Sequence, residues 1–151
     1  MHIIDQIKET LKAIVPLDTQ KMKNLQFASD WIDSGSGIFR LEKPAIPNPH
    51  LVAYFLLLDP LQKKVLFVDH KNAGLWLPAG GHVELNEHPK DTVKREVVEE
   101  LSIEASFLLE EPFFLTVSET AGQGTKHTDV SLWYLLKGCA NTQYAFDKSL
   151  L

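Results

Sequence analysis

The chain has 151 residues, of which 44% are apolar, and a formal net charge of −5. This length and apolar content predict a single domain with a substantial hydrophobic core. An acidic chain without a basic tract is a poor candidate for nucleic-acid binding, which requires Lys and Arg to neutralise phosphates. No apolar run reaches the roughly 18 residues of a membrane span, and Cys139 is the only cysteine. We therefore expect a cytoplasmic protein without a membrane segment or disulfide framework.

Two amphipathic helices are predicted at the start of the chain. Apolar residues at helical spacing indicate the first over residues 2–15, and Pro16 ends it. Asp18 is placed to cap the second, which the glycines of segment 35–37 terminate. The second helix has an apolar stripe with two aromatic residues beside it: Met22, Leu25, Ala28 and Ile32, with Phe27 and Trp31.

These helices form a predicted extension, residues 1–45, ahead of a main domain over residues 46–151. The simpler interpretation is that they pack on that domain or on a second copy of the chain, which makes a homodimer possible. The alternative is that they shape a substrate pocket. The proline-containing stretch 38–50 is expected to join the two parts as an extended connector.

Short β-prone runs predict the strands of the main domain. His50–Leu58 and Lys64–Asp69 read as a hairpin, because the turn-forming segment 59–63 separates them. Four more strands are predicted in chain order: Leu75–Leu77, Phe107–Glu110, Phe113–Ser118 and Val130–Lys137. Trp76 either fills the core, which is the interpretation we favour, or stacks on a substrate base.

The stretch Leu77–Ile103 carries the most specific chemical signal. It contains a glycine pair and then a helical run whose one face carries three glutamates, Glu96, Glu99 and Glu100. An adjacent arc of the same helix is apolar: Val93, Val97 and Leu101. Three carboxylates on one face repel one another, so either Arg95 or a divalent cation should offset them. Ligands that are all oxygen atoms favour Mg²⁺ or Mn²⁺. A solvated acidic face is the simpler alternative.

From Gly81 onward this spacing resembles the Nudix box, G-x5-E-x7-R-E-U-x-E-E-x-G-U, in which U is aliphatic. Every defined position matches except one, because Ser102 stands where the family has glycine. A glycine there would end the helix in a left-handed turn, which serine adopts less readily, so a different or mildly strained exit is expected. The resemblance implies an α/β fold, a Nudix α/β/α sandwich with a mixed sheet, here with a helical N-terminal extension.

The resemblance also implies an activity, the hydrolysis of a nucleoside diphosphate linked to another moiety, with Mg²⁺ or Mn²⁺ as cofactor. Four residues match the metal-ligand positions: Gly81, Glu96, Glu99 and Glu100. Glu87 and Arg95 match a pair that ties the preceding loop to the helix and orients the site. Together these residues are the candidate catalytic set.

The general base is not fixed by the box, and Glu96, Glu119 and His127 are all candidates. His127 and Asp129 lie two apart before a strand, so both side chains can face one side. The candidate substrate-binding residues are His82, Glu119, His127 and Asp129. An ordinary surface position for His127, and a packing role for His82, are the alternatives.

A small-molecule nucleotide is the expected substrate, with a (deoxy)nucleoside triphosphate slightly preferred. Family members that cleave ADP-ribose often have a proline farther beyond the box than Pro112 lies, but an ADP-ribose or sugar-nucleotide pyrophosphatase remains an alternative. An isopentenyl diphosphate isomerase needs a catalytic cysteine, and Cys139 lies beyond the last predicted strand. A non-enzymatic nucleotide sensor is the third alternative, although such proteins tend to lose the box carboxylates that this chain keeps.

Overall fold

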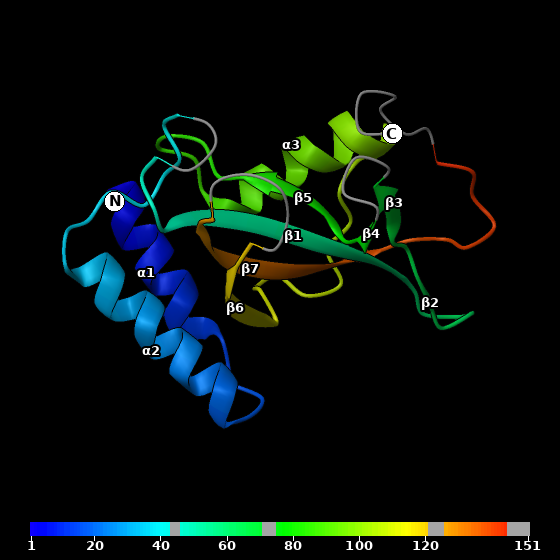
Figure 1. The fold of residues 1–151 in the computed structure, drawn as a ribbon. Coiled ribbons are helices and arrows are strands. Elements are labelled where there is room, and N and C mark those ends of the chain that lie inside the picture. Colours follow the sequence, from blue (N-terminus) through cyan, green and yellow to red (C-terminus); the bar gives the residue numbers. More distant parts are fainter. Residues whose placement is uncertain (43–45, 71–74, 121–125, 145–151) are drawn as a thin grey trace.

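The computed structural model describes residues 1–42, 46–70, 75–120 and 126–144 of the chain (Figure 1). Within these residues, two helices come first and seven strands follow, with a third helix between the fifth and the sixth strand. The elements are α1 (Ile3–Ala13), α2 (Thr19–Asp33), β1 (His50–Asp59), β2 (Lys64–Val65), β3 (Val68–His70), β4 (Leu75–Leu77), β5 (Ala79–His82), α3 (Pro89–Leu101), β6 (Phe114–Glu119) and β7 (Thr128–Lys137). The predicted α/β class with a helical N-terminal extension is therefore confirmed.

Strand β1 is the centre of a mixed, five-stranded sheet. It pairs antiparallel with β2 and β5 and parallel with β7, whose other edge pairs antiparallel with β6. The parallel register places His50 beside Asp129 and Tyr54 beside Trp133. Strands β3 and β4 form a separate two-stranded sheet.

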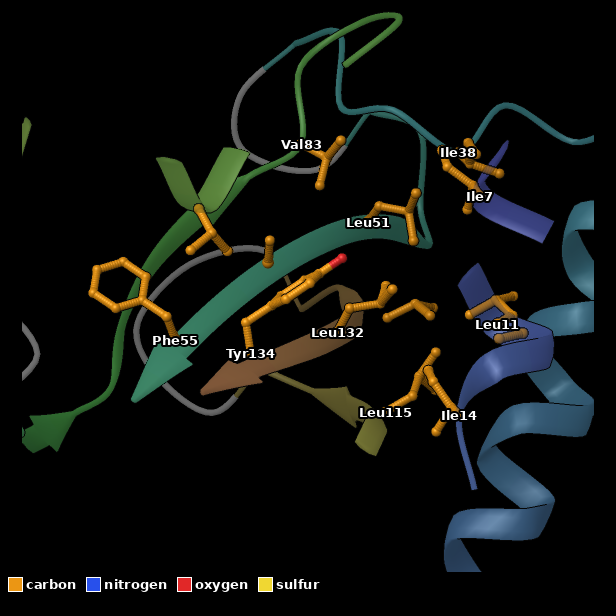
Figure 2. Close-up of a cluster of buried hydrophobic side chains, with 14 of the residues drawn as sticks. Ile7, Leu11, Ile14, Ile38, Leu51, Phe55, Val83, Leu115, Leu132 and Tyr134 are labelled. Carbon is orange, nitrogen blue, oxygen red and sulfur yellow. The ribbon is translucent and has the colours of Figure 1, made fainter. Parts of the chain in front are cut away.

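The hydrophobic core lies against one face of the main sheet, where alternate side chains of β1 and β7 are buried (Figure 2). These residues are Leu51, Ala53, Phe55, Val130, Leu132 and Tyr134. Helix α3 packs on β5 and β1 and contributes the predicted apolar arc, since its three residues are at most 1% exposed: Val93, Val97 and Leu101. The alternating residues of the strands point to the other face, and two of them, Tyr54 and Trp133, are half-buried there.

Helices α1 and α2 lie side by side and pack against the same buried cluster (Figure 1). The predicted cap of α2 is confirmed, because Asp18 Oδ1 accepts a hydrogen bond of 2.7 Å from the backbone N–H of Lys21. Met22 of the predicted apolar stripe is 59% exposed, so that assignment was wrong. The buried face of α2 is rotated towards Asn24 and Trp31, since α2 packs along the edge strand β6.

The extension is also connected to the start of α3. His88 caps α3 by accepting a hydrogen bond from the backbone N–H of Lys90 at its Nδ1 atom. The other ring nitrogen of His88, Nε2, lies 2.9 Å from Thr10 Oγ1 of α1. A side chain of the extension therefore helps to orient the cap of the helix that carries the three glutamates.

Two strand predictions need correction. The run Lys64–Asp69 is not one strand, because only Lys64 and Val65 pair with β1 and the chain then turns to pair with β4. Residues Phe107–Glu110 form no strand, only an isolated bridge between Phe107 and Leu136. The backbone N–H groups of residues 108 and 113 bond to carbonyls only two residues apart on β7, so the intervening segment bulges away from the sheet.

The core position predicted for Trp76 was also wrong. Its side chain is 69% exposed, because β4 pairs with β3 outside the main sheet.

Ser102 adopts the left-handed conformation that was expected of glycine. Its φ is 56° and its ψ is 35°, and its backbone N–H donates to the carbonyl of Val98 at 2.9 Å. The helix therefore ends in the left-handed turn of the family pattern, although residue 102 is a serine where the pattern has a glycine.

Replacing Ser102 by Gly should raise the free energy of unfolding by about 0.5–1 kcal/mol, since glycine adopts positive φ without steric cost. The measurement is urea denaturation of the purified variant. Ser106→Gly is the control, because exposed Ser106 does not have a positive φ and the change should be slightly destabilising. A loss of stability in the Ser102 variant would contradict the reading of this helix exit.

Candidate active site

Arg95 is the centre of an ion-pair network at the start of the acidic helix face. Its Nε and Nη2 atoms both bond to the carboxylate of Glu87 at 3.0 Å. Its Nη1 atom bonds to Glu96 Oε1 at 2.6 Å and lies 3.6 Å from Glu99 Oε2. Arg95 therefore offsets part of the negative charge of this face, as the sequence suggested.

Glu87 ties the loop before α3 to the helix. Besides Arg95, its carboxylate accepts hydrogen bonds from Thr92 Oγ1 at 2.7 Å and from the backbone N–H of Glu84 at 3.0 Å. Burial opposes ionisation, but these hydrogen bonds, that of Arg95 first, leave the pKa of Glu87 below its ordinary value. Glu87 and Arg95 are thus joined by two hydrogen bonds between the loop and the helix, and their role in orienting the site stays a prediction.

Glu100 is buried and the side chain of Glu96 is 14% exposed, whereas the side chain of Glu99 is 55% exposed. Burial and the neighbouring charge of Glu96 raise the pKa of Glu100 to about 8, although the backbone N–H of Gly80 donates to it. Burial also raises the pKa of Glu96, despite the opposing effect of Arg95. The network around Arg95 therefore does not fully offset the charge of this face.

Gly81 lies on β5 directly against the glutamate face. A Cβ atom at this position would come within 2.3 Å of Glu96 Oε1, so only glycine leaves room for the carboxylate. The four residues predicted as metal ligands, Gly81, Glu96, Glu99 and Glu100, therefore come from two elements that pack together. Their donors are all oxygen atoms and part of their charge is uncompensated, and this combination fits a hard divalent cation.

Glu100 should make the stability of the metal-free protein depend on pH. Because its carboxyl binds a proton more tightly in the folded than in the unfolded state, the free energy of unfolding falls as pH rises from about 5 to about 8. The slope from this group is at most about 1.4 kcal/mol per pH unit. Glu100→Gln should remove this component, so the variant's stability advantage over wild type should grow with pH.

The measurement is urea denaturation in EDTA at several pH values. Burial lowers the pKa of His88, so this residue makes the free energy of unfolding rise with pH at lower pH values. Both proteins contain His88, so its contribution cancels when the variant is compared with wild type. Exposed Glu104, changed to Gln, is the matched control and should follow wild type. Parallel profiles for the Glu100 variant and wild type would refute the assignment.

Three of the predicted substrate-binding residues meet at the start of β1 and β7. His82, His127 and Asp129 gather around His50, which the sequence analysis did not select, and one ligand atom from each lies within 4.8 Å of the others. The fourth predicted residue, Glu119, is exposed at the end of β6 and is not in this group. The sequence feature that could have identified His50 as a site residue is its position as the first residue of an apolar strand.

The imidazole of His82 is held in its neutral form. Burial and the nearby charges of Arg40 and His50 lower the pKa of His82 to about 4, although Asp129 opposes them. Its ring centroid lies 4.9 Å from that of His50. At neutral pH this ring therefore has a lone pair on one nitrogen.

A row of aromatic rings crosses the half-buried face of the sheet and was also missed. The ring centroids of Tyr54 and Trp133 lie 4.9 Å apart, and those of Trp133 and Phe114 lie 5.2 Å apart in a stacked arrangement. Tyr54 also lines a pocket together with Gly80 and Glu100. The row depends on the register between β1, β7 and β6, which the sequence pattern alone does not specify.

Comparison with known proteins agrees with this architecture. The model of the NUDIX domain family matches residues 48–146. None of the curated proteins that were compared matches the chain. The predicted division at residue 45 stays a prediction.

Two solved structures show the same fold. The dihydroneopterin triphosphate pyrophosphohydrolase of E. coli is 18% identical with a TM-score of 0.53, and the match covers 65% of this chain and 74% of that chain. A hydrolase of the NUDIX family from Clostridium perfringens is 22% identical with a TM-score of 0.51, covering 68% of this chain and 76% of that one. With two thirds of its length matched by the family model, this chain belongs to the Nudix family of hydrolases.

Proposed function

We propose that the protein hydrolyses the pyrophosphate bond of a nucleoside diphosphate linked to another moiety, with Mg²⁺ or Mn²⁺ as cofactor. The observation that carries this proposal is the packing of Glu96 and Glu100 against the glycine pair of β5, held by Arg95 and Glu87. Cleavage of a phosphoanhydride requires neutralisation of the phosphoryl oxygens and an oriented water molecule. A buried carboxylate cluster beside a pocket supplies the ligands for such chemistry.

The residues of the set divide between two roles in this proposal. Glu96, Glu99, Glu100 and the carbonyl of Gly81 would hold the cation, which would neutralise phosphoryl charge and lower the pKa of a bound water. Arg95 and Glu87 keep the glutamate side chains in place. Of the three candidates for the general base, Glu96 lies within this set, whereas Glu119 is the last residue of β6 and His127 directly precedes β7.

The aromatic row supports a nucleotide as substrate. Tyr54 belongs to the row and also lines the pocket that includes Glu100, so a base stacked on the row would leave its phosphates near the carboxylates. A (deoxy)nucleoside triphosphate is our preferred substrate, and an ADP-ribose or sugar-nucleotide substrate is the alternative.

Because Cys139 is exposed and free, we also favour a cytoplasmic location. A homodimer stays possible.

None of the helices in the described part of the chain has the length and apolar character needed to cross a membrane.

The test is phosphate and pyrophosphate release from a panel of nucleoside triphosphates, sugar nucleotides and dinucleotides, with Mg²⁺ and with EDTA. We expect turnover of one substrate class that EDTA abolishes. Tight nucleotide binding in calorimetry without any turnover would refute the hydrolase proposal and favour a nucleotide sensor.

A further inference from the structure

We infer that His50, His82, His127 and Asp129 form a second metal site, which binds a borderline cation such as Zn²⁺ in preference to Mg²⁺. We call these residues the histidine group. The group lies at the start of β1 and β7 and the end of β5, so it is assembled from three strands and the residue that precedes β7. The inference does not depend on the proposed hydrolase activity, because none of these four residues belongs to the proposed magnesium site.

The hydrogen bonds of His50 leave one of its nitrogen atoms facing a carboxylate. Nδ1 of this completely buried ring lies 2.8 Å from the carbonyl oxygen of Pro47, to which it donates its proton. In the neutral ring Nε2 is then an acceptor, yet it lies 3.1 Å from Oδ1 of Asp129 without hydrogen-bond geometry. Two acceptors facing each other in a buried site need a cation between them, either a proton or a metal ion.

The ring of His127 faces the same carboxylate oxygen of Asp129. Its Nδ1 atom lies 3.3 Å from Thr120 Oγ1, and its Nε2 atom lies 3.4 Å from Asp129 Oδ1. A histidine that binds a metal almost always uses its second nitrogen to bond to a protein oxygen, which orients the ring. His50 and His127 thus both have the orienting contact of a metal ligand.

The third imidazole completes the donor set. Nε2 of His82 is buried and has no hydrogen-bond partner within the described part of the chain. Buried polar atoms of proteins rarely remain without a partner, so this atom also points to an absent ligand. Three imidazole nitrogens and one carboxylate oxygen thus converge within 4.8 Å.

This donor set selects the class of metal. Imidazole favours Zn²⁺, Cu²⁺, Ni²⁺ and Fe²⁺, whereas Mg²⁺ prefers oxygen ligands. Four ligands at about 2.0–2.1 Å from a tetrahedral Zn²⁺ lie about 3.3 Å from one another, so the group would contract by roughly 1.5 Å at its widest separation. The half-buried rings of His82 and His127 leave a route for the ion to enter.

The nearby positive charge of Arg40 opposes the binding of a cation by the histidine group. Arg40 lowers the pKa of His82, but within the described residues no arginine or lysine lies within 4 Å of the carboxylate of Asp129. Among the described residues, the ion pairs of Asp129 are those with the imidazoles of His50 and His127. Its negative charge is therefore available to a metal at short range, where it outweighs a more distant positive charge.

The histidine group is separate from the glutamate face, although the two adjoin along β5. Gly81 faces Glu96, and the side chain of the next residue, His82, points to the opposite face of the strand. The carbonyl of His82 accepts a hydrogen bond of 3.3 Å from Arg95 Nη2. The chain can thus hold a hard cation on one side of β5 and a borderline cation on the other.

Equilibrium dialysis of the metal-stripped full chain against Zn²⁺ with excess Mg²⁺ tests the inference. We expect one Zn²⁺ per chain, and Co²⁺ in its place should give the visible absorption of a tetrahedral, nitrogen-rich site. His127→Gln should weaken Zn²⁺ binding at least tenfold. Thr120→Val removes the hydroxyl that contacts Nδ1 and the backbone of His127 and leaves all four proposed ligands in place, so it should weaken binding by about tenfold. The second variant keeps the test valid if the first does not fold.

The matched control carries Glu96→Gln, Glu99→Gln and Glu100→Gln together, which disables the glutamate face. This variant should still bind one Zn²⁺ with the same visible Co²⁺ spectrum. Zn²⁺ binding that disappears in the control but persists in both the His127→Gln and the Thr120→Val variants would place the ion at the glutamates and overturn the inference. Less than stoichiometric Zn²⁺ in the wild-type chain would also overturn it, while leaving the hydrolase proposal intact.

Discussion

Replacing Glu99 or Glu100 by glutamine is expected to lower the rate of pyrophosphate hydrolysis by roughly a thousandfold, since metal stabilisation of the transition state is worth several kcal/mol. Neither substitution should lower the stability of the folded protein. The side chain of Glu99 is 55% exposed, so its charge contributes little to stability. Glu100 is only 8% exposed, and its neutral replacement should stabilise the metal-free protein, because burial disfavours the charged form.

The measurement is kcat at saturating Mg²⁺ on the substrate class that the panel identifies, with circular dichroism to confirm folding. Glu104→Gln removes an exposed glutamate just beyond the helix and should leave turnover unchanged. If both glutamine variants retain wild-type turnover, these residues do not hold the catalytic cation.

The two adjacent glycines of β5 should respond in opposite ways to alanine. A Cβ atom at Gly80 would lie 2.3 Å from the carbonyl oxygen of Ala53 and 2.8 Å from Cα of Tyr54, which are backbone atoms of the central strand. The φ of Gly80 is also 154°, a value that other residues rarely adopt. Gly80→Ala should therefore reduce the free energy of unfolding by roughly 3 kcal/mol or more, because the pairing of β1 with β5 must change.

Gly81→Ala should affect the chemistry and not the stability. The Cβ atom would collide with the end of the Glu96 side chain, which can swing away at little cost to the fold. We expect a change of about 1 kcal/mol or less in unfolding free energy but a large loss of turnover, since the displaced carboxylate leaves the glutamate face.

Urea denaturation and Mg²⁺-dependent turnover of both glycine variants decide between these expectations. Each variant is the control for the other, because the substitution is the same and the positions are neighbours. Equal losses of stability, or full turnover in the Gly81 variant, would contradict the different roles assigned to the two glycines.

The local part of this site could be predicted from the sequence, because helical spacing alone places Glu96, Glu99 and Glu100 on one face. The capping of α2 by Asp18 depends on equally local geometry. In contrast, the histidine group depends on the parallel pairing that sets His50 beside Asp129, and no local pattern encodes that register.

The errors have the same origin. Trp76 is apolar enough for the core, but its strand belongs to the small second sheet, which only the tertiary arrangement reveals. Residues Phe107–Glu110 have the composition of a strand, yet their backbone bonds to β7 at only a few points. Composition describes what a segment can form, whereas pairing partners decide what it does form.

The parallel pairing of β1 with β7 has a consequence for the order in which the molecule folds. Strand β5 and helix α3 are neighbours in sequence, so their contacts close short loops and can form early. The long ladder between β1 and β7 joins distant parts of the chain, and its loop-closure entropy must be overcome before the contacts stabilise it. We therefore expect the long-range ladder to limit the folding rate, so that the glutamate face assembles ahead of the histidine group.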